Sequence, residues 1–333
     1  MRVLIVLPGA LGDVVRALPF LGRLRRGWPQ AHLAWVVEPL SAPVLQGHPW
    51  LDEVLVFPRR DGVVAVGGFL RQVRAAGFDV ALDLGRGAKS ALVTWASRAP
   101  RRIGFARADG REGSWLVDSE HLPPQGVERS KLAQFLAFGD LLQLPTSEVS
   151  FGLAPTDAEV EEAAAFTTGL RPPLIALSVG SSCPSRRWFP EPTAQVVRTL
   201  AMRHHASAVL LGTAADANFA LAVARAAGDV PLRDLVGRTS VRQLMAVLAR
   251  ARLAVGPDSG ALHLAAAVGT RVVSLWGPTS AGRSAPAGSE TFVVHGEATC
   301  APCFLKTCPI GRVCMQSIAA ETVLAKAEAA LAA

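Results

Sequence analysis

A group of polar residues near the end of the chain has the types and spacing that suit an anion or a sugar hydroxyl. Asp258, Ser259 and Gly260 follow an apolar run, and His263 comes one helical turn later. A turn of this kind at the start of a helix presents backbone N–H groups and a hydroxyl to a phosphate. Asp and Ser are also common capping residues, so an ordinary N-cap is the alternative.

Two further loops with polar residues follow apolar runs in the second half of the chain. In the stretch SVGSSCPSRRWFP, small residues precede Arg186 and Arg187, which favours a phosphate cradle. An exposed loop without a ligand is the alternative. In the stretch GTAADA, Asp216 follows the next apolar run and is expected either to bond the hydroxyls of a ribose or to cap a helix.

The first half of the chain offers a carboxylate and a pair of cations. The stretch PGALGD places Asp13 in the first turn of a predicted helix, where its position by itself favours a capping residue over a catalyst. Its glycine spacing differs from the dinucleotide fingerprint, which disfavours a nicotinamide dehydrogenase. The stretch LGRGAKS is not a Walker A loop, because Ala88 stands between Gly87 and Lys89. Arg86 and Lys89 remain a candidate anion-binding pair.

Four of the five cysteines lie in one short segment, CAPCFLKTCPIGRVC, and are Cys300, Cys303, Cys308 and Cys314. Four thiolates can bind zinc tetrahedrally. Only the first two have the C-x-x-C spacing of common zinc sites, so free packed thiols are the default interpretation. The sequence predicts no metal cofactor, with zinc at these four residues as the alternative.

Short β-branched runs alternate with helical stretches through both halves of the chain, and these elements must position the loops. The expected strands are Val3–Leu7, His32–Val37, Glu53–Phe57, Val80–Leu84, Arg102–Phe105, Leu174–Ser178, Ala208–Leu211, Leu253–Gly256 and Arg271–Leu275. The expected helices are Leu11–Arg26, Val64–Ala76, Lys89–Ser97, Lys131–Leu142, Glu191–His205, Asp216–Ala227, Val241–Arg250 and Gly260–Val268.

This alternation predicts the α/β class, with doubly wound parallel sheets covered by helices on both faces. In such sheets, ligands bind beyond the carboxyl ends of the strands, where the polar loops described above are found. A proline-rich segment from Leu144 to Pro173 is expected to be the linker. We therefore predict two Rossmann-like domains, residues 1–160 and 161–333, that face each other across a cleft.

Composition sets limits on the partners of the protein. Of 333 residues, 50% are hydrophobic and 18% are charged, which is typical of a globular chain with large cores. The net charge of +7 favours an anionic partner, but no basic run is interleaved with aromatic residues, so nucleic acid is not expected. Pro8 and Gly9 interrupt the apolar start, and no apolar run is long enough to span a bilayer. We expect a soluble, cytoplasmic protein.

Three stretches together resemble glycosyltransferase family 9, the lipopolysaccharide heptosyltransferases. These are GDVVRALPFLGRLRR near the start, RRWFP at mid-chain and GPDSGALHLAAAVGTRVVSLWGPTS near the end, supported by FDVALDLGRGAKSALVTWASRAPRRIGFAR. The resemblance covers nearly the whole chain in the correct order. It implies the GT-B architecture and an inverting, metal-independent transfer of heptose from ADP-heptose to the inner core of lipopolysaccharide.

The resemblance also implies roles for individual residues. Asp13 matches the general base of the family, and the Asp258 turn matches the site of the donor diphosphate. Arg186 stands where the family usually has Lys, and Asp216 stands where it often has a longer Glu. The donor-binding candidates are Arg186, Arg187, Thr213, Asp216, Thr239, Asp258, Ser259, Gly260 and His263, the last as support or core packing. The acceptor-binding candidates are Gly12, Arg86, Lys89, Arg101 and Arg102.

The expected acceptor is an anionic, lipid-linked molecule of the Kdo2-lipid A type, so the protein is expected to associate transiently with the cytoplasmic face of the inner membrane. The stretches WVVEP and LGRGAKS resemble the first heptosyltransferase, which acts on Kdo, more than the second, which acts on heptose. Alternatives are the second enzyme, another family 9 transferase, a nucleotide-sugar epimerase and a non-catalytic nucleotide-sugar binder. An epimerase would need a different acid/base set, and a binder would not need Asp13.

Overall fold

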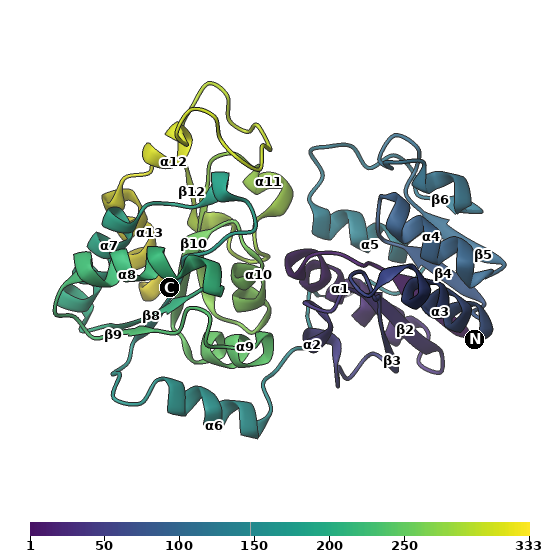
Figure 1. Cartoon of the computed structure of the whole chain (residues 1–333), viewed down its shortest axis with the longest axis horizontal. Helices are drawn as coiled ribbons and strands as arrows, with labels where there is room; N and C mark the ends of the chain where they lie inside the picture. Colours follow the sequence, from purple (N-terminus) through teal and green to yellow (C-terminus); the bar gives the residue numbers. More distant parts are fainter. Residues whose placement is uncertain (147) are drawn as a thin grey trace. The chain divides into compact units, whose positions relative to one another are not determined.

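The chain folds into two compact units, Met1–Leu153 and Ala154–Ala333, in a computed structural model that describes residues 1–146 and 148–333. Each unit contains one six-stranded sheet whose strand pairings are parallel. Figure 1 shows helices on both faces of each sheet. The predicted fold class, α/β with two doubly wound parallel sheets, is confirmed.

The first unit is built from six strands and the helices between them. Its strands are β1 (Arg2–Val6), β2 (His32–Val37), β3 (Glu53–Val56), β4 (Val80–Asp83), β5 (Arg101–Gly104) and β6 (Glu120–His121). Its helices are α1 (Leu11–Gly27), α2 (Ala42–Leu45), α3 (Gly62–Ala75), α4 (Ala88–Ser97), the 3-10 helix η1 (Ser114–Val117) and α5 (Lys131–Leu141).

The second unit repeats this plan with a longer set of helices. Its strands are β7 (Leu174–Ser178), β8 (Ser207–Leu211), β9 (Leu232–Asp234), β10 (Leu253–Pro257), β11 (Arg271–Trp276) and β12 (Val293–His295). Its helices are α6 (Asp157–Phe166), α7 (Pro190–His204), α8 (Ala217–Ala227), α9 (Val241–Arg250), α10 (Gly260–Ala267), α11 (Ala281–Ser284), α12 (Val313–Gln316) and α13 (Ala320–Ala332). It also contains the 3-10 helices η2 (Pro184–Arg186), η3 (Ala214–Asp216) and η4 (Glu290–Phe292).

The two sheets have the same strand order. The first is β3-β2-β1-β4-β5-β6, and the second is β12-β11-β10-β7-β8-β9, which is the same order when its strands are counted from β7. The direction of the connections reverses between β1 and β4 in one unit and between β7 and β10 in the other. Ligands of doubly wound sheets bind outside the carboxyl ends of the strands at such a switch point. Each unit therefore has one place where a ligand site is expected.

The nine predicted strands are present, with ends that move by one residue at most, and the structure adds three short edge strands, β6, β9 and β12. It also adds α6 inside the segment expected to be a linker. A capping box starts this helix: Thr156 Oγ1 accepts a hydrogen bond from the Glu159 N–H, and the Glu159 side chain accepts one from the Thr156 N–H. Glu159 also pairs with Arg242 of α9 at 2.6 and 2.7 Å, which joins α6 to the second unit.

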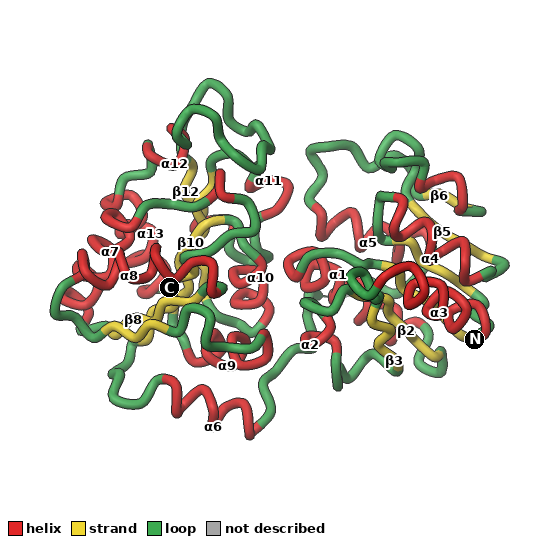
Figure 2. Tube along the Cα trace, viewed as in Figure 1, coloured by secondary structure: helices red, strands yellow, loops and turns green. Residues whose placement is uncertain are grey.

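The hydrophobic core of each unit contains side chains of the sheet and of the covering helices. Figure 2 shows these strands in yellow and the helices in red. The largest fully buried side chains include Trp35 on β2 and Trp276 on β11. In each sheet the inner strands are buried along nearly their whole length, as expected of parallel strands covered on both faces. Within the described ranges, no helix combines the length and the apolar character needed to cross a membrane.

Candidate active site

Both switch points carry charged residues at the carboxyl ends of the strands. In the first unit, Asp13 lies in the first turn of α1, directly after β1. In the second unit, Asp258 directly follows β10 and Arg186 lies in the loop after β7. We call these groups the Asp13 cluster and the Asp258 cluster.

The Asp13 cluster is an acid held by two cations. Asp13 Oδ1 lies 2.5 Å from Arg16 Nη2 and 2.8 Å from Lys131 Nζ, and 27% of the Asp13 side chain is exposed. Burial raises the pKa of Asp13, but the charges and hydrogen bonds of Arg16 and Lys131 outweigh burial and hold this pKa far below its usual range. With both cations in place, the cluster therefore presents a carboxylate that is charged at neutral pH and that solvent can reach.

The position of Lys131 depends on how α5 is attached to α1. Arg23 of α1 is buried and donates hydrogen bonds to three carbonyl oxygens, that of Leu136 in the middle of α5 and those of Leu144 and Pro145 just after it, at 2.8–3.2 Å. A Cβ atom at Gly139 would lie 2.7 Å from Arg23 Cζ, so only glycine lets the guanidinium lie against α5. This contact fixes α5 alongside α1, and its first residue, Lys131, then reaches Asp13.

Arg86 and Lys89, two of the predicted acceptor-binding residues, lie at the same edge of the sheet as Asp13. Lys89 forms an ion pair with Glu38, and its Nζ lies 3.5 Å from the Pro8 carbonyl oxygen. Arg86 stacks on Phe105, with Cζ 4.0 Å from the ring centre, and donates to the buried side chain of Gln134 on α5. The structure thus brings Arg86 to α5 and Lys89 to the loop that precedes Asp13.

Arg101 and Arg102 are not brought to the Asp13 cluster. They begin β5, and Arg101 pairs in the parallel ladder with Val80 at the start of β4, so they lie at the amino end of the sheet. Arg101 forms a bidentate ion pair with Glu120 at 2.7 and 2.9 Å, and Arg102 donates to the carbonyl oxygens of Val117 and Ala99. Gly12, by contrast, is buried in the first turn of α1 beside Asp13.

The Asp258 cluster joins the loops that follow β7, β10 and β11. Asp258 is 7% exposed, and its Oδ2 lies 3.0 Å from Arg186 Nη1 and 3.0 Å from Thr279 Oγ1. The Ser181 hydroxyl donates to the Asp258 carbonyl oxygen at 3.0 Å. Ser259 does not cap α10 with its side chain; its hydroxyl instead lies 3.1 Å from Ser178 Oγ. The first turn of α10, which begins at Gly260, therefore has no side-chain cap at its N-cap residue.

A second acid and arginine pair lies beside it. Asp216 is 2% exposed; its Oδ2 accepts from the N–H and hydroxyl of Thr213 at 2.9 and 2.8 Å, and its Oδ1 lies 2.8 Å from Arg187 Nη2. A Cβ atom at Gly180 would lie 2.4 Å from Asp216 Oδ2, so this glycine makes room for the carboxylate. Asp216 therefore points inward and joins the loops after β7 and β8.

The other donor candidates differ in how close they come to these loops. Thr239 is partly buried and follows Gly237, whose N–H donates to the Gly212 carbonyl oxygen at 3.0 Å, so it lies near the loop after β8. His263 is 3% exposed in the second turn of α10. The role predicted for it, support or core packing, stays a prediction.

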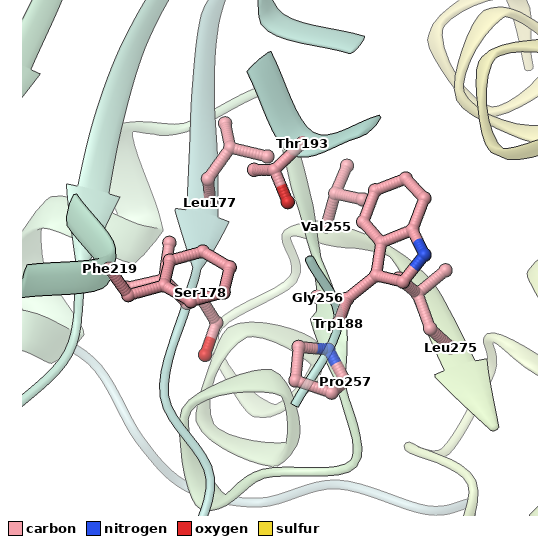
Figure 3. Close-up of a pocket in the computed structure, with 10 residues that line it drawn as sticks. Leu177, Ser178, Trp188, Thr193, Phe219, Val255, Gly256, Pro257 and Leu275 are labelled. Atoms are coloured by element: carbon pink, nitrogen blue, oxygen red, sulfur yellow. The ribbon is translucent and has the colours of Figure 1, made fainter. Parts of the chain in front are cut away.

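Sequence reasoning missed Trp188, which secures the loop directly after the two arginines. Trp188 directly follows them, is 4% exposed, and donates from Nε1 to the Ile318 carbonyl oxygen at 3.2 Å. Figure 3 shows Trp188 beside Val255, Gly256 and Leu275 around a small apolar pocket beneath the loop. Its volume of about 10 Å³ has room for one water molecule. The signal in the sequence was a Trp directly after two arginines.

The cysteine segment packs against this same loop. The Ser185 N–H donates to the Lys306 carbonyl oxygen at 3.1 Å, and the Ser185 hydroxyl donates to that of Leu305 at 2.5 Å. All five cysteines are free thiols; burial and the neighbouring thiols raise the pKa of Cys314. In the part of the chain that the structure describes, no group of three or more His, Cys, Asp or Glu side chains is arranged to hold a metal ion.

Comparison with known proteins gives one consistent result. Residues 66–314 match the model of glycosyltransferase family 9 (heptosyltransferase). The chain is 28% identical to lipopolysaccharide heptosyltransferase 1 of Pseudomonas aeruginosa, over 92% of this chain and 87% of the relative. It is 25% identical to the lipopolysaccharide core heptosyltransferase OpsX of Haemophilus influenzae, over 86% and 81%.

Solved structures show the same fold. A family 9 glycosyl transferase of Veillonella parvula superimposes with a TM-score of 0.85 at 20% identity, and covers 99% of this chain and 97% of its own. The Escherichia coli heptosyltransferase WaaC, solved with ADP, superimposes with a TM-score of 0.79 at 21% identity, over 99% and 100%. The chain therefore has the GT-B fold of these structures.

Proposed function

This chain belongs to glycosyltransferase family 9, the heptosyltransferases, and on that premise we propose that it transfers heptose from ADP-heptose to the inner core of lipopolysaccharide. The observation that carries the proposal is the pair of charged clusters, one at the switch point of each sheet. One contains a carboxylate that solvent can reach, which suits proton transfer from an acceptor hydroxyl. The other contains two arginines beside a helix start, which suits a diphosphate.

In this proposal the second unit binds the donor. Arg186, Arg187 and the backbone N–H groups at the start of α10 hold the diphosphate. As the bond to the anomeric carbon breaks, negative charge grows on the departing ADP, and these groups stabilise it. Asp258 and Asp216 hold the two guanidinium groups in place at 3.0 and 2.8 Å, which supports binding because the donor need not order the arginines. Asp258 also offers a carboxylate to the heptose hydroxyls.

The first unit binds the acceptor. An acceptor hydroxyl attacks the anomeric carbon from the face opposite ADP, which inverts the configuration, and its proton passes to Asp13. Arg86 and Lys89 are the cations at this sheet edge, and they suit the carboxylates of a Kdo acceptor through charge-assisted hydrogen bonds. Arg101 and Arg102 are left out of this site, because they lie at the other end of the strands.

We further propose that the acceptor is a Kdo residue of Kdo2-lipid A, as for the first heptosyltransferase, and that the reaction takes place at the cytoplasmic face of the inner membrane, where a lipid-linked acceptor is anchored. The curated relatives include first and second heptosyltransferases at 28% and 26% identity, so acceptor choice needs a direct assay.

The test measures ADP release from ADP-heptose with three additions: no acceptor, lipid A carrying only Kdo, and the same acceptor already bearing one heptose. We expect release to depend on the Kdo acceptor and to give a heptosylated product. Release without any acceptor would indicate hydrolysis or another reaction of the donor, and donor binding without release would indicate a non-catalytic binder. Transfer only to the heptose-bearing acceptor would overturn the choice of acceptor and leave the transferase proposal intact.

A further inference from the structure

Lys131 occupies a position that helix energetics disfavour. It is the first residue of α5, after the N-cap Ser130, whose side chain accepts a hydrogen bond from the Ala133 N–H at 3.2 Å. The start of a helix carries partial positive charge, so a lysine there is destabilising unless an anion compensates. Asp13 supplies that anion, 2.8 Å from Lys131 Nζ. Asp13, on another helix, therefore holds the ammonium at the Asp13 cluster.

The two cations on Asp13 differ in how easily they can leave. Arg16 is on the same helix as Asp13, one turn later, and its side chain is only 9% exposed. Lys131 comes from a different helix, and 29% of its side chain is exposed. Burial and a shared helix keep Arg16 in place. A solvent-reachable lysine on a flexible stem can exchange one anion for another.

The two ion pairs of Asp13, with Arg16 and Lys131, conflict with its proposed role as a general base. A general base works best when its pKa is near the working pH. Burial raises the pKa of Asp13, but Arg16 of α1 and Lys131 of α5 lower it more. The pKa of Asp13 is therefore far below its usual range. The nearby Lys89 is paired with Glu38, and Arg86 contacts Gln134 and Phe105. Of the two cations on Asp13, Lys131 is the one that a ligand can draw away.

We propose that the acceptor itself frees Asp13 by taking over Lys131. In the free protein the Lys131 ammonium holds Asp13 Oδ1; in the complex it binds a carboxylate of the acceptor, which is then a sugar acid with its carboxylate close to the attacking hydroxyl. Asp13 is left with Arg16 and accepts the proton that the hydroxyl loses as its oxygen bonds to the anomeric carbon. The inference depends on the proposed function for the identity of the acceptor.

The mechanism gives Lys131 two effects on one reaction. It contributes to acceptor binding through a charge-assisted hydrogen bond, and it suppresses the base until an anionic acceptor is present. Loss of an opposite charge at this distance raises the pKa of a carboxylate by about 1 to 3 units, which is about a tenfold to thousandfold gain in proton affinity. A neutral sugar with the same hydroxyl would bind without this gain.

The experiment follows Asp13 directly by NMR titration of its side-chain ¹³C carboxyl in the full chain, labelled at aspartate. The signal is assigned by its absence from Asp13→Asn. In the free wild type we expect no titration across the range of an ordinary aspartate, about pH 3 to 5. Saturation with a soluble Kdo disaccharide should move the midpoint upward by about one unit or more, and its methyl ester, which lacks the carboxylate charge, should not.

Two lysine variants separate this role from a structural one. Lys131→Met should raise the Asp13 midpoint without any acceptor and remove the further effect of the Kdo disaccharide, whereas Lys131→Arg should behave like the wild type. Lys326→Met, a lysine of the second unit that donates to the Thr291 carbonyl oxygen, is the matched control and should leave the titration unchanged. Asp13→Asn should bind the disaccharide about tenfold more tightly than the wild type, because the acceptor no longer competes with Asp13 for Lys131.

The disaccharide could bind, as shown by shifts of other NMR signals, without moving the titration midpoint of Asp13. That result would overturn this inference and leave the proposed function intact. An unchanged Asp13 midpoint in Lys131→Met would also overturn it. Absence of any binding by the Kdo disaccharide or by Kdo2-lipid A would overturn the Kdo acceptor and this inference together. Equal effects of the disaccharide and its methyl ester would show that the acceptor carboxylate is not the group that takes Lys131.

Discussion

The replacement Arg187→Met should destabilise the second unit through the acid that it leaves behind. Asp216 is 2% exposed, and Arg187 Nη2 lies 2.8 Å from its Oδ1. Methionine is close to arginine in length and fills the apolar part of its path, but it removes the cation. The carboxylate would then be buried with two hydrogen bonds from Thr213 and no charge to balance it.

The size of the effect follows from this burial. Removing one partner of a buried ion pair costs about 3–5 kcal/mol, because the remaining charge has lost its solvation and its counter-ion. We expect a loss of unfolding free energy near the lower value, about 3 kcal/mol. The reasons are that the Thr213 hydrogen bonds remain and that 28% of the Arg187 side chain is exposed. For a unit of this size, about 2–4 °C is lost per kcal/mol, so we expect the melting temperature to fall by about 10 °C.

The assay is thermal unfolding followed by circular dichroism, with two companion variants. Arg203→Met is the matched control, because Arg203 is 62% exposed and pairs with Glu328 at the surface, where an ion pair contributes about 0–1 kcal/mol. Asp216→Asn in the Arg187→Met background removes the buried charge and should recover more than half of the loss. A melting temperature for Arg187→Met no lower than that of Arg203→Met would refute the reasoning, as would a double variant no more stable than Arg187→Met.

Variants at three other positions test the two sites and a half-buried acid. Asp13→Asn should lower turnover by about 10²–10⁴-fold while ADP-heptose binding, measured by calorimetry, survives; near-full turnover would make Asp13 only a structural residue. Arg186→Ala should weaken donor binding and slow turnover, and Arg186→Lys should recover much of both; equal donor affinity in wild type and Arg186→Ala would remove Arg186 from the site. Burial raises the pKa of Asp118 to about 6, above its unfolded value, so its contribution to stability is complete below about pH 4 and is lost as pH rises through about 6. Asp118→Asn should therefore raise the melting temperature at about pH 8 and change it little at about pH 4, and an equal effect at both values would contradict this sign.

The sequence alone determined the fold class, because the signals for it are local. Runs of β-branched residues such as Leu174–Ser178 are apolar at nearly every position, as strands covered on both faces must be, and helical stretches separate them. The short edge strands β6, β9 and β12 have only two or three residues, too few to show such a pattern. Helix α6 lies among prolines, and its capping box was the signal that could have identified it.

The sequence also located the loops that carry the candidate site, since residues beyond the carboxyl ends of strands can be found once the strands are known. It did not determine what surrounds each side chain. Lys131 is 118 residues from Asp13, and their contact depends on the packing of α5 against α1 through Arg23. No local pattern in the sequence encodes that approach.

Strand register and burial determined which of the candidate residues lie at the sites and which partners they contact. Arg101 and Arg102 are next to a strand in sequence, but the pairing of Arg101 with Val80 puts them at the end of the sheet opposite Asp13. Asp216 and Asp258 are both acids in strand-end loops; the space left by Gly180 turns Asp216 inward toward Thr213 and Arg187, while Asp258 holds Arg186 and Thr279. Local chemistry determines what a residue can do, whereas the packing of distant segments determines which partners it meets.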